Sequence, residues 1–214
     1  MGIRTGQQFL EGLKDSREIW LEGDRVQDVT TDPKLGRMAK TLAGLFDLQH
    51  DSVLHDDMTF KSPTTGDPVP LSFIIPKNQD DLLKRRRALE IMANAHHGIL
   101  GRTPDYVNIQ VTATRQMAAL HGRKEKRFAD NLNLYHEYIR DNDLSLTHCF
   151  GHPQVNRGVA VGQQPDPYIP VGVVDTTSEG VILRGAKLLA TLAPFSDEIF
   201  VPPYRPLRGK EEEM

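Results

Sequence analysis

The sequence predicts an α+β protein in which a mainly helical domain, residues 1–143, precedes the first part of a β domain, residues 144–214. Two observations predict this order. In the first part, apolar residues recur at the three- and four-residue spacing of amphipathic helices. From residue 144 onward, apolar and polar residues alternate, as in strands with one buried face. We find no internal repeat that would suggest a different architecture.

The composition is that of a globular protein without a special environment. The 214 residues are 38% hydrophobic and 26% charged, with a formal net charge of −3. This charge gives no broad basic field for nucleic acid or anionic membranes. A single cysteine, Cys149, excludes a disulfide framework and a multi-cysteine metal or cluster site within the chain. No apolar run is long enough to span a membrane, and the N-terminus lacks a signal-peptide pattern, so we expect a cytoplasmic protein.

The helical part begins with a short capped helix and a hairpin. Thr5 has the position of an N-cap, with Gln8 placed to complete a capping box. Residues 19–29 alternate like two short strands, with Glu22, Gly23 and Asp24 as the turn. Asp32 and Pro33 are then predicted to start a stronger helix. Its apolar face consists of Leu35, Met38, Leu42, Leu45 and Phe46.

Three further helices are predicted after a proline-rich stretch. Residues 60–77 contain four prolines, so we expect non-helical chain there, with residues 71–75 buried and extended. Asn78 is the predicted N-cap of the next helix, which runs to the break at Gly98, and Thr103 the N-cap of another. The last helix ends at Asp143. The predicted apolar faces of the first and last of these helices are Leu82, Leu83, Leu89, Met92 and Ala95, and Phe128, Leu132, Tyr135 and Ile139.

The β part has few strands. Residues 144–150 alternate as one strand, residues 168–176 and 181–189 flank a hairpin turn at Ser178–Gly180, and residues 198–201 begin another strand. About four short strands do not close a barrel or fill both layers of a sandwich. We therefore expect that a partner supplies the rest or that the chain is the front part of a longer protein.

Common catalytic signatures are absent from the sequence. It has no HExxH, GxSxG or Walker A motif and no GxGxxG after a predicted strand. The eight histidines show no metal-ligand spacing, so we expect no metal site.

Two sets of residues carry candidate chemistry. Arg102, Tyr106 and His148 combine a permanent cation, a phenol and a base near neutral pH, and together could hold a phenolic hydroxyl. The alternatives are that Arg102 pairs with Asp105 and that His148 is a half-buried structural histidine. Gln154, Asn156 and Arg157 offer amide and guanidinium donors for a flat heterocycle or a phosphate, or form an ordinary polar loop.

A series of segments is similar to a known family in order and spacing. They are REIWLEGDRVQDVTTDP, LFDLQHD, MTFKSPTTGDPVPLSF, GRTPDY, FADN, DNDLSLTH, HPQVNR and RGAKLLATLAPFSDE. Together they resemble the oxygenase component of 4-hydroxyphenylacetate 3-monooxygenase, a two-component flavin-dependent aromatic hydroxylase family. The resemblance extends from about residue 4 to residue 201.

The resemblance implies both a fold and a reaction. The fold is that of acyl-CoA dehydrogenases, with an N-terminal helical domain, a central β domain and a C-terminal helical bundle that is missing from this sequence. The reaction is ortho-hydroxylation of a phenol such as 4-hydroxyphenylacetate, with O₂ and reduced FAD from a separate flavin reductase. FMN remains an alternative to FAD. The resemblance also implies a homo-oligomer, a tetramer in the complete form.

The resemblance also implies roles for individual residues. Arg102, Tyr106 and His148 would surround the substrate hydroxyl. The flavin-binding residues would be His148, Cys149, Phe150, Gln154, Val155, Asn156, Arg157 and Thr191.

Two departures from the family favour an alternative. Family members are considerably longer, and residues 202–214 do not follow the family pattern. The alternative is a truncated, non-catalytic fragment or remnant that needs a partner chain to fold fully. A related branch, the 4-hydroxybutyryl-CoA dehydratases, needs several cluster-ligating cysteines, and the single cysteine disfavours it.

Overall fold

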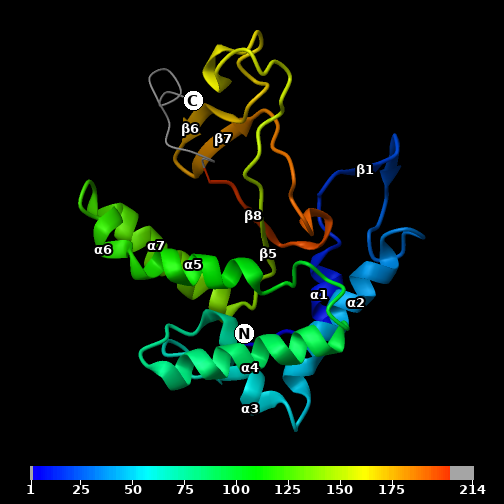
Figure 1. Ribbon diagram of the computed structural model, residues 1–214, viewed down its shortest axis with the longest axis vertical. Coiled ribbons are helices and arrows are strands. Elements are labelled where there is room, and N and C mark those ends of the chain that lie inside the picture. The colour runs from blue at the N-terminus through cyan, green and yellow to red at the C-terminus, as the bar shows by residue number, and fades with distance from the viewer. Residues whose placement is uncertain (1, 203–214) are drawn as a thin grey trace. The chain divides into compact units, whose positions relative to one another are not determined.

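The computed structural model describes residues 2–202, so most of the divergent segment 202–214 lies outside the described residues (Figure 1). The chain forms two compact units. The first comprises the chain up to Leu146 together with Pro194–Glu198, and the second comprises Thr147–Ala193 and the chain from Ile199. Helices dominate the first unit and strands the second, which confirms the α+β class.

The first unit contains helices connected by short hairpins and 3₁₀ turns. Its elements are α1 (Gly6–Gly12), β1 (Ile19–Leu21), β2 (Asp24–Val26), α2 (Gly36–Asp47), η1 (Leu48–His50), α3 (His55–Met58), β3 (Thr59–Lys61), β4 (Pro68–Pro70), η2 (Leu71–Phe73), α4 (Gln79–Ala95), α5 (Tyr106–Gln116), α6 (Ala118–His121) and α7 (Lys126–Asp141). The strands pair locally, β1 with β2 and β3 with β4, both antiparallel.

The first helix confirms its predicted cap and packs closely on α2. The Thr5 hydroxyl accepts from the Gln8 N–H, and the Gln8 side chain accepts from the Thr5 N–H, which completes the capping box. Figure 1 shows α1 beside α2. At Gly6, a Cβ atom would come within 2.5 Å of the Ala43 carbonyl oxygen, so this approach requires glycine.

The first hairpin has a tighter turn than predicted. Asp24 belongs to β2, and Glu22 and Gly23 alone form the turn, with φ of 56° and 94°. Positive φ at both positions is the geometry of a two-residue turn that matches the twist of the paired strands.

The start of α2 differs from the prediction. The helix begins at Gly36, and a turn from Asp32 leads into it. The Asp32 carboxylate accepts from the N–H groups of Lys34 and Leu35, and the Gly36 N–H donates to the Asp32 carbonyl, as at the capped start of a helix. The predicted face is largely confirmed, since Leu42, Leu45 and Phe46 are buried.

The prediction of extended chain at residues 71–75 is wrong for the first three of these residues. Leu71–Phe73 form the 3₁₀ turn η2, immediately after the proline-containing strand β4. Leu71 and Phe73 are buried, as predicted. Burial therefore follows from the apolar composition, whereas the short run did not distinguish a strand from a helical turn.

The predicted cap of α4 is confirmed, and its predicted apolar face is confirmed in part. The Asn78 side chain accepts from the Asp81 N–H. Of the predicted face, Met92 is buried and Leu82 and Leu83 are exposed, so the buried residues lie in the second half of the helix. These are Ala88, Ile91 and Met92, of which the last two pack against Met58 of α3.

The boundaries of α5 and α7 were predicted less well than their existence. α5 begins at Tyr106, and Thr103 is not its cap, because the Thr103 hydroxyl donates to the Asp105 carboxylate. α7 ends at Asp141, before the predicted Asp143, whose φ of 49° is incompatible with a continuing helix.

The second unit consists of short strands and irregular segments. Its elements are β5 (Leu146–His148), η3 (Val161–Gln163), β6 (Gly172–Thr177), β7 (Gly180–Arg184), η4 (Ala193–Phe195) and β8 (Glu198–Phe200), of which β5, η4 and β8 begin or end in the first unit. β6 and β7 form the predicted hairpin with shorter strands, and β5, also shorter than predicted, pairs with β8. Within residues 2–202, no helix combines the length and apolar character needed to cross a bilayer.

Arg4 is the centre of a polar network in the first unit. Its guanidinium binds the Asp197 carboxylate through two nitrogens, at 2.6 and 3.1 Å. Its backbone N–H donates to the Asp143 carboxylate and its Nε donates to the Asp143 carbonyl, both at 2.9 Å. Gln49 also donates to the Asp143 carboxylate. The network joins the start of the chain to the segments after α7 and before β8.

We predict that Arg4→Ala lowers the free energy of unfolding by about 3 kcal/mol, because it leaves the largely buried Asp197 carboxylate without its cation and the Asp143 carbonyl without the Nε–H donor. Urea denaturation followed by far-UV circular dichroism measures the change. The matched control is Arg86→Ala, which removes an exposed pair with Glu90 and should have little effect. Equal effects of the two substitutions would contradict the central role of Arg4.

We predict that the contribution of Asp143 to stability falls as pH rises from 5 to 8. Burial raises the pKa of Asp143 from 3.8 to about 7. A carboxyl group whose pKa is raised in the folded state binds its proton more tightly there than in the unfolded chain. It therefore stabilises the fold fully at a pH below the unfolded pKa, and this stabilisation is lost as the pH rises through the folded pKa. In denaturant titrations, Asp143→Asn should reduce the difference between pH 5 and pH 8 by about 2 kcal/mol. An unchanged pH profile would show that Asp143 is not the group responsible.

Candidate active site

The predicted pair Arg102 and Tyr106 lies together in the first unit. The Arg102 guanidinium carbon is 5.1 Å from the centre of the Tyr106 ring, and its Nη1 donates to the Gly101 carbonyl at 2.8 Å. Arg102 is exposed and Tyr106 half-buried. A cation over the ring face is a favourable arrangement. The pair thus presents guanidinium donors and a phenol at the start of α5.

Asp105 points the other way, into the protein. It is 5% exposed and accepts from the Thr103 hydroxyl, and burial raises its pKa. No ion pair between Arg102 and Asp105 occurs among the described residues, so the alternative reading of Arg102 is not supported. The sequence suggested Asp105 only as a possible partner of Arg102, and its anchoring role in the interior was missed.

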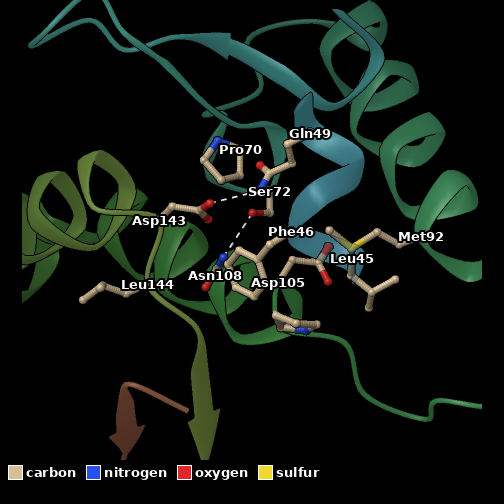
Figure 2. Close-up of a pocket in the computed structure, with 11 residues that line it drawn as sticks. Leu45, Phe46, Gln49, Pro70, Ser72, Met92, Asp105, Asn108, Asp143 and Leu144 are labelled. Atoms are coloured by element: carbon tan, nitrogen blue, oxygen red, sulfur yellow. Dashed lines mark hydrogen bonds between the residues drawn. The ribbon is translucent and has the colours of Figure 1, made fainter. Parts of the chain in front are cut away.

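Asp105 lines a small chamber inside the first unit, walled by both polar and apolar side chains (Figure 2). The chamber has a volume of about 20 Å³, enough for about one water molecule. Gln49 donates to Asp143 at 2.9 Å, and Asn108 donates to Ser72 at 3.2 Å. The inner side of the segment 102–108 is therefore built into a hydrogen-bonded interior. This interior gives the outward-facing Arg102 and Tyr106 a fixed base.

His148 belongs to the second unit, in a stretch of alternating exposure. The ring centres of His148 and Phe150 are 4.0 Å apart, and both residues are half-buried. Cys149 between them is buried, and its N–H donates to the Phe200 carbonyl at 3.0 Å. Burial raises the pKa of the Cys149 thiol, so it is no activated nucleophile.

The other predicted flavin residues also belong to the second unit. Gln154, Val155, Asn156 and Arg157 are exposed on irregular chain, and the Asn156 side chain accepts from the Gly158 N–H. Among the residues that the structure describes, none accepts a hydrogen bond or forms an ion pair with the Arg157 guanidinium. These free donors suit a heterocycle and a phosphate, so the donor set fits a flavin nucleotide.

Thr191 is exposed, and its carbonyl accepts from the Thr147 hydroxyl, which fixes it beside β5. Sequence reasoning missed Lys187, four residues earlier, whose ammonium contacts the Phe150 carbonyl at 3.3 Å. The only signal was a lysine inside the segment RGAKLLATLAPFSDE.

Between residues 2 and 202, no three histidine, cysteine or acidic side chains are grouped to hold a metal ion.

Comparison with known proteins identifies the family. The family model described as 4-hydroxyphenylacetate 3-hydroxylase N terminal matches residues 5–214. The chain belongs to this family. A 4-hydroxyphenylacetate 3-monooxygenase oxygenase component from Thermus thermophilus is 40% identical over 98% of the chain. The chain spans 42% of the length of that relative.

Solved structures agree with this family assignment. A crystal structure of the oxygenase component of 4-hydroxyphenylacetate 3-monooxygenase, complexed with FAD and 4-hydroxyphenylacetate, has a TM-score of 0.85 and 41% identity. The match covers 94% of this chain and 41% of that one. A 4-hydroxybutyryl-CoA dehydratase from N. maritimus shares only the fold, with a TM-score of 0.82 at 18% identity over 98% of this chain and 41% of that one. These neighbours confirm the predicted acyl-CoA dehydrogenase-like fold.

We predict that Cys149 reacts with a water-soluble disulfide reagent on the order of a hundredfold more slowly in the folded chain than in urea. The thiol is 5% exposed, so reaction requires local opening. Because Cys149 is the only cysteine in the sequence, the colour released by the reagent reports this site alone. Equal rates with and without urea would contradict the buried position of Cys149.

Proposed function

We propose that the chain is the N-terminal part of the oxygenase of a two-component flavin-dependent monooxygenase that hydroxylates a phenol ortho to its hydroxyl group. The observation that carries the proposal is 40% identity to a 4-hydroxyphenylacetate 3-monooxygenase oxygenase component over 98% of the chain. The paired Arg102 and Tyr106 and the free donors around Arg157 support it. In this proposal the helical domain is residues 1–143 and the β domain begins at residue 144.

The proposed roles follow from the chemistry of each side chain. The Arg102 guanidinium and the Tyr106 hydroxyl bind the phenolic oxygen, and the half-buried His148 takes its proton. Removing that proton raises the electron density of the ring at the ortho carbon. The free donors of Gln154, Asn156 and Arg157 hold the flavin, as do His148, Cys149, Phe150, Val155 and Thr191.

The proposed reaction consumes O₂ and reduced FAD. One oxygen atom enters the ring, the other leaves as water, and the FAD becomes oxidised. A separate flavin reductase supplies the reduced FAD, and the complete enzyme is a homo-oligomer. Reduced FAD contributes the electrons that activate O₂, while the protein orients the substrate and excludes water.

The proposal is tested in the complete enzyme with reduced FAD, O₂ and 4-hydroxyphenylacetate. Formation of the ortho-dihydroxy product supports the proposal, and oxidation of FAD without any hydroxylated product contradicts it. His148→Ala should lower hydroxylation by about 10²–10⁴-fold, because a positioned acid–base group is lost. FAD oxidation should continue and release hydrogen peroxide. The control is His121→Ala, which changes an exposed histidine of α6.

We predict that Arg102→Lys lowers the rate of hydroxylation at least tenfold. A lysine ammonium cannot replace the planar guanidinium, which lies over the Tyr106 ring and also donates hydrogen bonds from its edge. Initial rates at saturating and limiting 4-hydroxyphenylacetate separate an effect on KM from one on kcat. Arg123→Lys, at an exposed position, is the control. A near-normal Arg102→Lys enzyme would leave Arg102 with a structural role only.

A further inference from the structure

Lys187 lies where three stretches of the second unit meet. It is half-buried, although most side chains of the preceding strand β7 are exposed. Its Nζ is 3.3 Å from the Phe150 carbonyl oxygen, 3.4 Å from the Pro202 carbonyl oxygen and 3.4 Å from Nε2 of His152. An ammonium group has three N–H donors and no acceptor, so three acceptors match its bonding capacity.

The middle of the three stretches is residues 148–152, which has a neighbour on each side. On one side, the Cys149 N–H donates to the Phe200 carbonyl at 3.0 Å. On the other side, the Leu188 N–H donates to the Gly151 carbonyl at 2.9 Å. Lys187 comes from the second neighbour and reaches Pro202, which continues the first. One side chain therefore joins the outer stretches across the middle one.

The middle stretch also carries a row of rings. His148, Phe150 and His152 occupy alternate positions, and the first two rings are 4.0 Å apart. Lys187 contacts the row at the Phe150 backbone and at the His152 ring. Accepting from an ammonium requires a lone pair on Nε2, so this contact selects the His152 tautomer that carries its proton on Nδ1.

Removing the Lys187 ammonium from water costs free energy, so its position is not that of an incidental surface contact. The cost is visible in the pKa of Lys187, which burial lowers. An ordinary lysine would extend into solvent, and its long side chain loses several rotamers on being fixed. The three acceptors offset this cost.

We infer that Lys187 is a positioning residue whose ammonium holds residues 148–152 in the conformation that presents His148 and Phe150 to substrate and flavin. The functional half of this inference rests on the proposed function. The structural half concerns the chain alone and is tested separately.

The structural half is tested by amide hydrogen exchange of the full chain. Lys187→Met keeps most of the side-chain volume and removes the ammonium. It should raise the exchange rate of the Cys149 amide about tenfold or more, because charge-assisted bonds that hold the stretch are lost. Lys187→Arg, which keeps a cation and its donors, should restore part of the protection. The control is Lys126→Met, whose side chain is 89% exposed. Unchanged exchange in Lys187→Met overturns the inference.

The functional half is tested by coupling in the complete enzyme, measured as hydroxylated product formed per FAD oxidised. Lys187→Met should lower coupling by about ten- to a hundredfold, because misplacement of the reacting groups is costly, and Lys187→Arg should recover part of it. Faster exchange with normal coupling per folded enzyme would overturn the positioning role. If the unsubstituted enzyme forms no hydroxylated product, the proposed function fails, and the exchange result still decides whether Lys187 holds the stretch.

Discussion

The Arg4 network is the interaction on which the arrangement of the first unit depends. The Arg4 side chain binds the Asp197 carboxylate and the Asp143 carbonyl, and the Arg4 backbone N–H binds the Asp143 carboxylate, although both partners are more than a hundred residues away along the chain. Its guanidinium also lies 5.1 Å from the centre of the Phe46 ring, which stacks on Phe9. The polar network and the apolar contact between α1 and α2 therefore share one residue. Since Asp143 and Asp197 each lie a few residues before β5 and β8, Arg4 also fixes where both strands leave the first unit.

The segment 102–108 combines two tasks on opposite sides. Asp105 and Asn108 are buried and take part in the hydrogen bonds of the interior, whereas Arg102 is exposed and lies over the half-buried Tyr106 ring. The buried residues therefore restrict the positions of Arg102 and Tyr106, because all four side chains belong to the same short segment of backbone. Asp105 is thus a structural support for the pair beside it.

Local signals in the sequence were sufficient for much of the fold. The capping box at Thr5, the cap at Asn78 and the hairpin of β6 and β7 each depend on neighbouring residues, and each was predicted. At one boundary that was predicted wrongly, a side chain had a choice of local partners. The Thr103 hydroxyl donates to the Asp105 carboxylate instead of capping α5. The spacing of residues does not show which nearby group such a hydroxyl binds.

The candidate site was predictable in its residue types but not in its supports. Resemblance to a family indicated Arg102, Tyr106 and His148, whose roles stay predictions. The supporting roles of Lys187 and Asp105 were missed because their partners include backbone carbonyls and a nearby hydroxyl, groups that any sequence supplies. No spacing rule marks a lysine that bonds to the main chain.

The β6–β7 hairpin has a consequence for how this sequence can vary. Val173, Val181, Ile182 and Leu183 are 42–56% exposed, so polar replacements there remove little buried apolar surface from the described unit and should cost it little stability. The stability of this unit alone therefore gives selection little reason to keep these side chains apolar. A comparison of natural variants would show whether polar residues replace the apolar ones at these four positions. If the positions are always apolar, the hairpin surface is kept for a contact with another part of the protein or a partner.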